Sequence, residues 1–151
     1  MDSIDKKIIF ILQRQSDLPL SEIAKRVGLS QTPCWNRIKK LEEDGTIQRK
    51  TIVIDKKRVK LLVTIFLMIR VRNHNENWMK KFYEILKKYN NILEAHRITG
   101  SKADYIIKIV AESIEDYNNF QQILIKEIEF NSMSSCISLQ ELKNTTILPI
   151  R

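Results

Sequence analysis

The sequence contains few of the residues that punctuate or cross-link a chain, with three glycines, three prolines and two cysteines in 151 residues. Cys34 and Cys136 lie far apart and form no CxxC pair, so neither a disulfide framework nor a zinc site is predicted. The single, scattered glycines exclude a phosphate-binding glycine loop, and no nucleophile elbow is present. We therefore expect no catalytic residues, no cofactor and no metal.

Histidines and long apolar runs are equally scarce. His74 and His96 show no metal-ligand spacing, and His96, on a predicted strand, is more typical of a packed or edge-strand histidine than of a catalytic base. No apolar stretch approaches the roughly 18 residues that a membrane-spanning helix needs. The N-terminus, with acidic Asp2 and Asp5, lacks a secretory signal. The sequence predicts a cytoplasmic protein without a membrane partner.

Acidic residues are outnumbered, and the excess of positive charge is uneven. The net charge is +8; residues 1–60 carry 14 Lys and Arg against 8 Asp and Glu, whereas residues 61–151 carry 12 against 10. A basic excess of this kind indicates attraction to nucleic acid or to an anionic membrane, although it is also compatible with a merely solvated surface. Composition alone leaves these alternatives open.

Three short helices are predicted in the first 45 residues. Apolar residues recur at helical spacing over residues 2–14 and 20–27, and Gly28 ends the second segment. Ser30 is well placed as the N-cap of a third helix, which Gly45 ends. Residues 46–54 are rich in β-branched side chains, which favours extended chain, either a wing or a tether.

The rest of the chain is predicted to form a second domain. The expected boundaries are a first, helical domain at 1–54, a charged linker at 55–61 and a second domain at 62–151. Hydrophobic periodicity predicts this order of elements: a strand at 61–71, a helix at 76–89, strands at 92–99 and 105–110, a helix at 114–128 and a strand at 133–142. The order βαββαβ is that of a ferredoxin-like domain, so the expected fold class is α+β.

The first strand of this domain is apolar on both faces. In a ferredoxin-like fold both helices cover one face of the sheet, so the other face needs a different cover. Another subunit would supply it in a homo-oligomer. The alternative is that the tail, residues 144–151, folds across that face.

A short helix, a glycine turn and a polar, basic second helix have the order of a helix-turn-helix, whose second helix enters the major groove of DNA. Gln and Asn pair with adenine edges, Thr contacts thymine methyls or phosphates, and Lys neutralises phosphates. Lys39 and Lys40 are equally compatible with a solvated face, Trp35 with packing against the wing, and Arg37 with a structural or phosphate-clamping role. The candidate DNA-binding residues are Ser30, Gln31, Thr32, Trp35, Asn36, Arg37, Lys39 and Lys40.

The run Leu-Ser-Gln-Thr-Pro-Cys-Trp at 29–35, followed by Arg37-Ile38, Leu41-Glu42 and Gly45, resembles the recognition helix of the Lrp/AsnC family of transcription regulators. The likeness continues through the βαββαβ order, the turn from Gly100 to Asp104-Tyr105 and the closing residues 145–149, so it covers essentially the whole chain. It implies a winged helix-turn-helix joined to a ligand-sensing domain that dimerises through its sheets and often builds octamers.

The resemblance also implies an effector, commonly an amino acid, held between sensing domains. The residues carried over are Thr99, Gly100, Ser101, Asp104, Tyr105 and Ser135. A carboxylate and nearby hydroxyls suit the ammonium and carboxylate of an amino acid, although a plain hairpin turn with a surface Asp fits equally simply. The sequence departs from the family pattern in a turn that is one residue longer, in Lys102, and in the replacement of a customary Pro-Gly by residues 128–130.

Together these features predict a sequence-specific transcription regulator that binds double-stranded DNA as a homo-oligomer and responds to an amino-acid effector. The alternative is an architectural protein that coats DNA, with little sequence preference and no effector.

Overall fold

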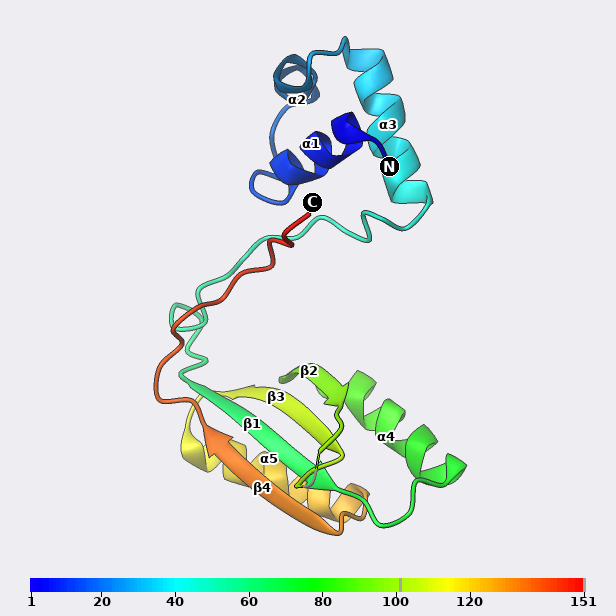
Figure 1. Cartoon of the computed structure of the whole chain (residues 1–151). Coiled ribbons are helices and arrows are strands. Elements are labelled where there is room, and N and C mark those ends of the chain that lie inside the picture. The colour runs from blue at the N-terminus through cyan, green and yellow to red at the C-terminus, as the bar shows by residue number, and fades with distance from the viewer. Residues whose placement is uncertain (101, 151) are drawn as a thin grey trace. The chain divides into compact units, whose positions relative to one another are not determined.

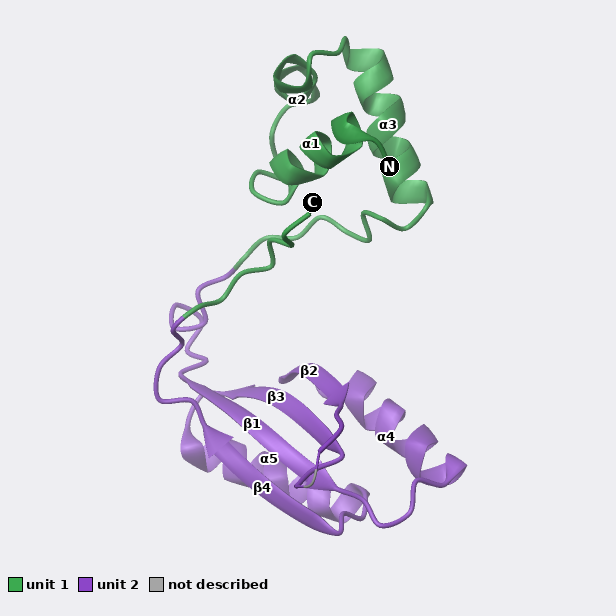
Figure 2. Cartoon of the chain, viewed as in Figure 1, with its two compact units in different colours: residues 1–53, 143–151 green, residues 54–142 purple. Residues whose placement is uncertain are grey.

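The computed structural model describes residues 1–100 and 102–150, and the chain divides into two compact units. The first consists of residues 1–53 together with 143–151, and the second of residues 54–142 (Figures 1 and 2). Residues 46–54 contain no helix or strand and lead from the first unit into the second. The segment that was expected to be a wing or a tether therefore connects the units without a regular element.

The first unit contains three helices, α1 (Ser3–Leu12), α2 (Leu20–Val27) and α3 (Gln31–Glu43). Asp2 caps α1 by accepting hydrogen bonds from the backbone of the first turn. Gly28 ends α2 in the left-handed conformation, with φ of 73°, which a residue with a Cβ adopts only at a cost. Buried apolar side chains from all three helices form one core: Ile8, Ile9, Ile23, Ala24, Val27, Cys34, Ile38 and Leu41.

The C-terminal tail, which was expected within the domain of residues 62–151, groups with this first unit. Gln13, after the end of α1, binds the backbone of Leu148 in both directions: its Oε1 accepts from the Leu148 N–H at 2.6 Å, and its Nε2 donates to the Leu148 carbonyl at 3.3 Å. Ile150 packs against the helical core. These contacts hold the tail against α1.

The second unit has the predicted βαββαβ order. Its elements are β1 (Val63–Arg70), α4 (Glu76–Lys88), β2 (Ile92–Arg97), β3 (Tyr105–Ala111), α5 (Ile114–Glu127) and β4 (Ser132–Ile137). The strands form an antiparallel sheet in the order β2-β3-β1-β4, with β1 paired to both β3 and β4. The ferredoxin-like α+β fold is thereby confirmed. β4 ends at Ile137 rather than at residue 142, and Leu139 beyond it is fully exposed.

The two faces of the sheet differ in burial. Ile65, Leu67 and Ile69 of β1 are completely buried under side chains of α4 and α5. Because side chains alternate along a strand, Phe66 and Met68 lie on the opposite face, where they are only partly buried. The described residues of the second unit thus cover one face of the sheet and leave apolar side chains on the other.

Candidate functional site

The outer side of α3 is the first candidate site. Its core-facing residues Cys34, Ile38 and Leu41 are buried at helical spacing, which turns the intervening positions toward solvent. The predicted DNA-binding residues that the structure leaves exposed are Ser30, Gln31, Thr32, Trp35, Asn36, Lys39 and Lys40. Ser30 is the N-cap, but within the described part of the chain its side chain makes no capping hydrogen bond. One helix therefore presents a continuous set of hydrogen-bond donors and acceptors with two lysines.

Arg37 is placed differently from the other predicted DNA contacts. Its Nη1 lies 2.6 Å from an oxygen of Asp2 and 2.7 Å from an oxygen of Asp5, both at the start of α1. The hydrogen bonds that Arg37 donates, first to Asp2 and then to Asp5, raise the pKa of Arg37. The pKa of Asp2 is lowered, first by the Asp5 backbone N–H and then by Arg37. This guanidinium links α3 to α1, the structural role that the sequence left open.

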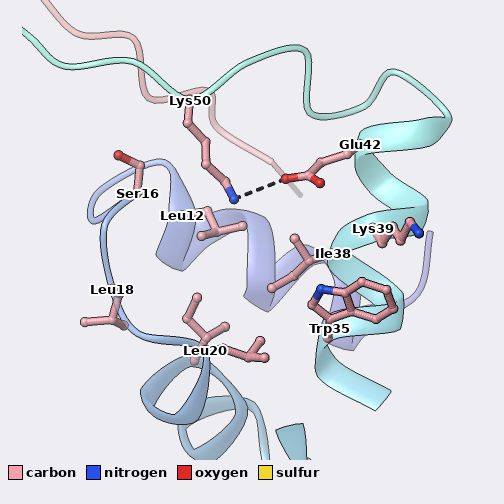
Figure 3. A pocket seen from close by; sticks show the side chains of 10 residues that line it. Leu12, Ser16, Leu18, Leu20, Trp35, Ile38, Lys39, Glu42 and Lys50 are labelled. Carbon is pink, nitrogen blue, oxygen red and sulfur yellow. Dashed lines mark ion pairs between the residues drawn. The ribbon is translucent and has the colours of Figure 1, made fainter. Parts of the chain in front are cut away.

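Trp35 borders a cavity of about 340 Å³ in the first unit (Figure 3). Its half-exposed ring lies 4.9 Å from the Lys39 ammonium, a cation–π contact. At the rim Lys50 and Glu42 form an ion pair at 3.1 Å. Leucines and isoleucines from all three helices and the loop between α1 and α2 line the rest: Leu12, Leu18, Leu20, Ile23 and Ile38. Trp35 is thus placed at the edge between this cavity and the exposed face of α3.

The second candidate site is the turn between β2 and β3. Asp104 is built into the sheet here: its N–H donates to the Ile69 carbonyl, its carbonyl accepts from Ile98, and its Oδ2 accepts from the Val71 N–H at 2.8 Å. Thr99 and Gly100 are exposed beside it. Asp104 therefore fixes the end of β1 with one carboxylate oxygen.

Tyr105 is a core residue. It is 3% exposed, and its hydroxyl lies 3.2 Å from the sulfur of Met79. Burial raises the pKa of this phenol. Around its ring stand Trp78 and Phe82 of α4 and the exposed His74, with ring centroids 5.1 to 5.7 Å away. No local sequence pattern indicated this aromatic cluster, because its members come from α4, from β3 and from the segment before α4.

Ser135 lies away from the turn. Ser135 lies in the middle of β4 and pairs with Leu67 of β1. Its hydroxyl contacts two side chains of α5: it lies 2.5 Å from the Tyr117 hydroxyl, and it accepts a hydrogen bond from Gln121 Nε2 at 3.2 Å. β1 separates β4 from β3, so Ser135 is about two strand spacings, roughly 10 Å, from the strand of Tyr105. One chain does not bring Ser135 and the turn together. Ser101, also predicted, lies outside the described residues.

Among the described residues there is no group of three or more His, Cys, Asp or Glu that could hold a metal. His96 lies 3.7 Å from Glu94, which pairs with Lys108 at 2.8 Å, and that lysine lowers the pKa of Glu94. Burial raises the pKa of the Cys34 thiol in the helical core. No helix in the described part of the chain is long and apolar enough to cross a membrane.

Two family profiles match the chain, one for each part of this architecture. Residues 1–48 match the winged helix-turn-helix DNA-binding family, and residues 64–148 match the Lrp/AsnC ligand-binding domain. The first match contains α3 and its exposed face, and the second contains the whole sheet with the turn between β2 and β3. The family profiles therefore agree with the predicted fold, with DNA binding by the first part of the chain and with ligand binding by the second.

Individual proteins resemble the chain over nearly its full length. The glutamate uptake regulatory protein of Zymomonas mobilis is 32% identical, covering 99% of this chain and 91% of its own, and the transcriptional activator DecR of Escherichia coli is 30% identical, covering 99% of both. Among solved structures, an AsnC family regulator from Agrobacterium tumefaciens is 40% identical with a TM-score of 0.93, covering 99% of this chain and 97% of that one.

A transcriptional regulator from Neisseria meningitidis, solved in complex with L-methionine, is 27% identical with a TM-score of 0.92 and covers 99% of this chain and 96% of its own. Fold, family profiles and relatives thus agree on both halves of the chain. The protein is a transcription regulator with a DNA-binding helix-turn-helix and a ligand-binding domain, and it belongs to the Lrp/AsnC family.

Proposed function

We propose that this regulator recognises a specific duplex DNA sequence through the exposed face of α3, and that an amino acid modulates its assembly or its DNA binding. The observation that carries the first part is the exposed set of amide, hydroxyl and ammonium groups on one helix. Gln31 and Asn36 have the bidentate geometry that reads adenine edges, and Thr32 suits a thymine methyl or a phosphate. Lys39 and Lys40 neutralise phosphates, which carry no sequence information.

The active form in this proposal is a homo-oligomer, a dimer and in higher assembly an octamer. The uncovered face of the sheet supports it, because Phe66, Met68 and Ile106 lie there only partly buried. When a second copy covers apolar side chains grouped on one face, their removal from water stabilises the assembly. A dimer presents two α3 helices to major grooves one helical turn, about 34 Å, or a multiple of it apart.

The effector part rests on the ligand-binding domain and on Asp104. One of its carboxylate oxygens, Oδ2, accepts from the Val71 N–H. Among the described residues no hydrogen bond involves Oδ1, and we assign this oxygen to the ammonium group of an amino acid. Thr99 offers a hydroxyl on the same turn. The related neisserial regulator binds L-methionine, which makes amino acids the class to test first. Tyr105 supports the turn from below rather than contacting the ligand.

An effector acts only by binding one state of the protein better than another. The architectural alternative gains support from one observation, that Ser135 and the turn are not brought together in a single chain. In an effector-binding assembly the missing contacts would come from a second subunit. In an architectural protein they would be absent.

The test is the melting temperature of the purified protein with each of the twenty amino acids. A ligand at 100 times its Kd stabilises the native state by about 2.7 kcal/mol, which raises the Tm of the second unit, a domain of fewer than 100 residues, by roughly 11–22 °C. One amino acid that raises Tm and alters DNA affinity supports the proposal. If none does so, and duplexes of different sequence bind equally, the architectural alternative is correct.

A further inference from the structure

The six-residue turn Asp55–Lys60 at the start of the second unit is basic and well ordered. Asp55 shapes it: its carboxylate accepts from the Lys57 N–H at 2.9 Å and its carbonyl accepts from the Arg58 N–H at 3.0 Å. The Lys60 N–H donates to the Lys57 carbonyl, and Lys60 takes the left-handed conformation with φ of 62°. Backbone hydrogen bonds therefore hold Asp55, Lys57, Arg58 and Lys60 in a defined turn.

Lys56 anchors the turn to the rest of the second unit. Its ammonium lies 2.7 Å from a carboxylate oxygen of Glu141, beyond β4, and 3.4 Å from the Thr64 hydroxyl in β1. The Leu61 N–H closes the turn on the Lys56 carbonyl at 2.9 Å. The cation of Lys56 is thus used internally, and the turn is held where β1 begins.

The other three cations, Lys57, Arg58 and Lys60, are exposed, and no described residue forms an ion pair with any of them. They also account for the charge of the unit. Residues 54–142 carry 14 Lys and Arg against 11 Asp and Glu, and residues 55–60 carry 4 against 1, so the remainder of the unit is neutral. A ligand-binding domain has no evident need for three unpaired cations gathered on one ordered turn.

Duplex DNA is the polyanion that this turn is most favourably placed to meet. The chain from the end of α3 to Lys57 spans at most about 50 Å when extended, and one turn of duplex is about 34 Å. Whenever α3 is bound, phosphates of the flanking duplex therefore lie within reach. Such tethering gives the turn an effective concentration near DNA that an anionic membrane does not have.

We propose that Lys57, Arg58 and Lys60 form a second, sequence-independent DNA contact that binds backbone phosphates flanking the duplex read by α3. This contact makes the ligand-binding unit part of the DNA-binding surface, so that a change in that unit alters the path of flanking DNA. The inference rests on the proposed reading of DNA by α3, but the two fail in different ways.

The test is the salt dependence of DNA affinity for the full-length triple variant K57Q/R58Q/K60Q. The probe is a duplex selected by the wild-type protein from a random library, used as the selected core alone and with about two helical turns added on each side. Each phosphate contact contributes about 0.9 to the slope of log K against log salt. With three contacts, affinity of the wild type for the extended duplex falls roughly 40-fold more between 50 and 200 mM salt than that of the variant.

A matched control removes three exposed lysines elsewhere in the same unit, K80Q/K87Q/K126Q, with the same change in net charge. This control keeps the wild-type slope on the extended duplex, and the core alone does not distinguish the triple variant from the wild type. The single variant Lys57→Gln, which disturbs the turn least, lowers the slope by about 0.9 if the triple variant folds poorly.

Equal slopes for wild type and triple variant on the extended duplex overturn the inference, as does an equal loss in the control. Binding to vesicles of phosphatidylglycerol and phosphatidylcholine that depends on the three cations, with no change in DNA slope, assigns the turn to a membrane instead and also overturns it. A wild type that selects no duplex from the library refutes the reading of sequence by α3. That result would leave the inference about the turn open to test, because the slope of log K against log salt on any long duplex still measures the phosphate contacts of the turn.

Discussion

Replacing Asp104 separates its structural contact from its proposed ligand contact. Its Oδ2 accepts from the N–H of Val71, a residue that is only 8% exposed. A hydrogen bond to a charged group contributes about 1.5–3 kcal/mol, and a buried N–H left without a partner costs a similar amount. Asp104→Ala is therefore expected to destabilise the second unit by about 2 kcal/mol. For a domain of fewer than 100 residues this lowers Tm by roughly 8–16 °C.

Asp104→Asn is the matched variant, because the amide oxygen still accepts from Val71 while the charge is lost. We expect it to retain most of the stability, with a loss of about 1 kcal/mol or less, but to lose the thermal shift produced by an amino acid. Differential scanning calorimetry with and without the effector measures both quantities. An alanine variant as stable as the wild type refutes the Val71 argument, and an asparagine variant with an undiminished ligand shift refutes ammonium binding.

Three further predictions concern the contacts between α1 and its neighbours. Arg37→Ala is expected to weaken DNA binding without changing which sequence is preferred, because the ion pairs with Asp2 and Asp5 position α3; an altered sequence preference in a selection assay would mean that Arg37 reads bases. The pKa of Asp2 is lowered in the folded protein, so its contribution to stability is present above the ordinary aspartate pKa of about 3.9 and is lost as pH falls through the lowered pKa. In acid titrations followed by circular dichroism, the wild type is therefore expected to lose more stability than Arg37→Ala. Deleting residues 143–151 is expected to lower the Tm of the first unit, because Ile150 leaves the helical core; an unchanged melting profile would show that tail contacts add nothing.

The elements of the fold were predictable because their signals are local. Ser30 and Gly45 mark the ends of α3, and the apolar spacing between them identifies its buried face. The order of strands and helices along the chain followed from the hydrophobic periodicity of each segment, and needed no long-range information. The same periodicity predicted correctly which side of α3 is exposed.

The sites were less predictable because their contacts join distant parts of the chain. Arg37 meets Asp2 across 35 residues, Asp104 meets Val71 across 33, and Leu148 meets Gln13 across 135. None of these pairs has a periodic signature. Tyr105 was assigned to the effector from a family pattern, whereas its position on the helix-covered face of β3 makes it a core residue. The tail was assigned by sequence order, which does not show where a chain packs.

The proposal that α3 reads DNA sequence is best tested by the ratio of affinities for a selected duplex and a scrambled duplex at one salt concentration. We expect a ratio of roughly a thousand or more for the wild type. We also expect that Gln31→Ala and Asn36→Ala each reduce this ratio by about 1–3 kcal/mol, or roughly 5- to 150-fold, while binding to the scrambled duplex is unchanged. A wild-type ratio near one, or a ratio that neither variant alters, would contradict the proposal.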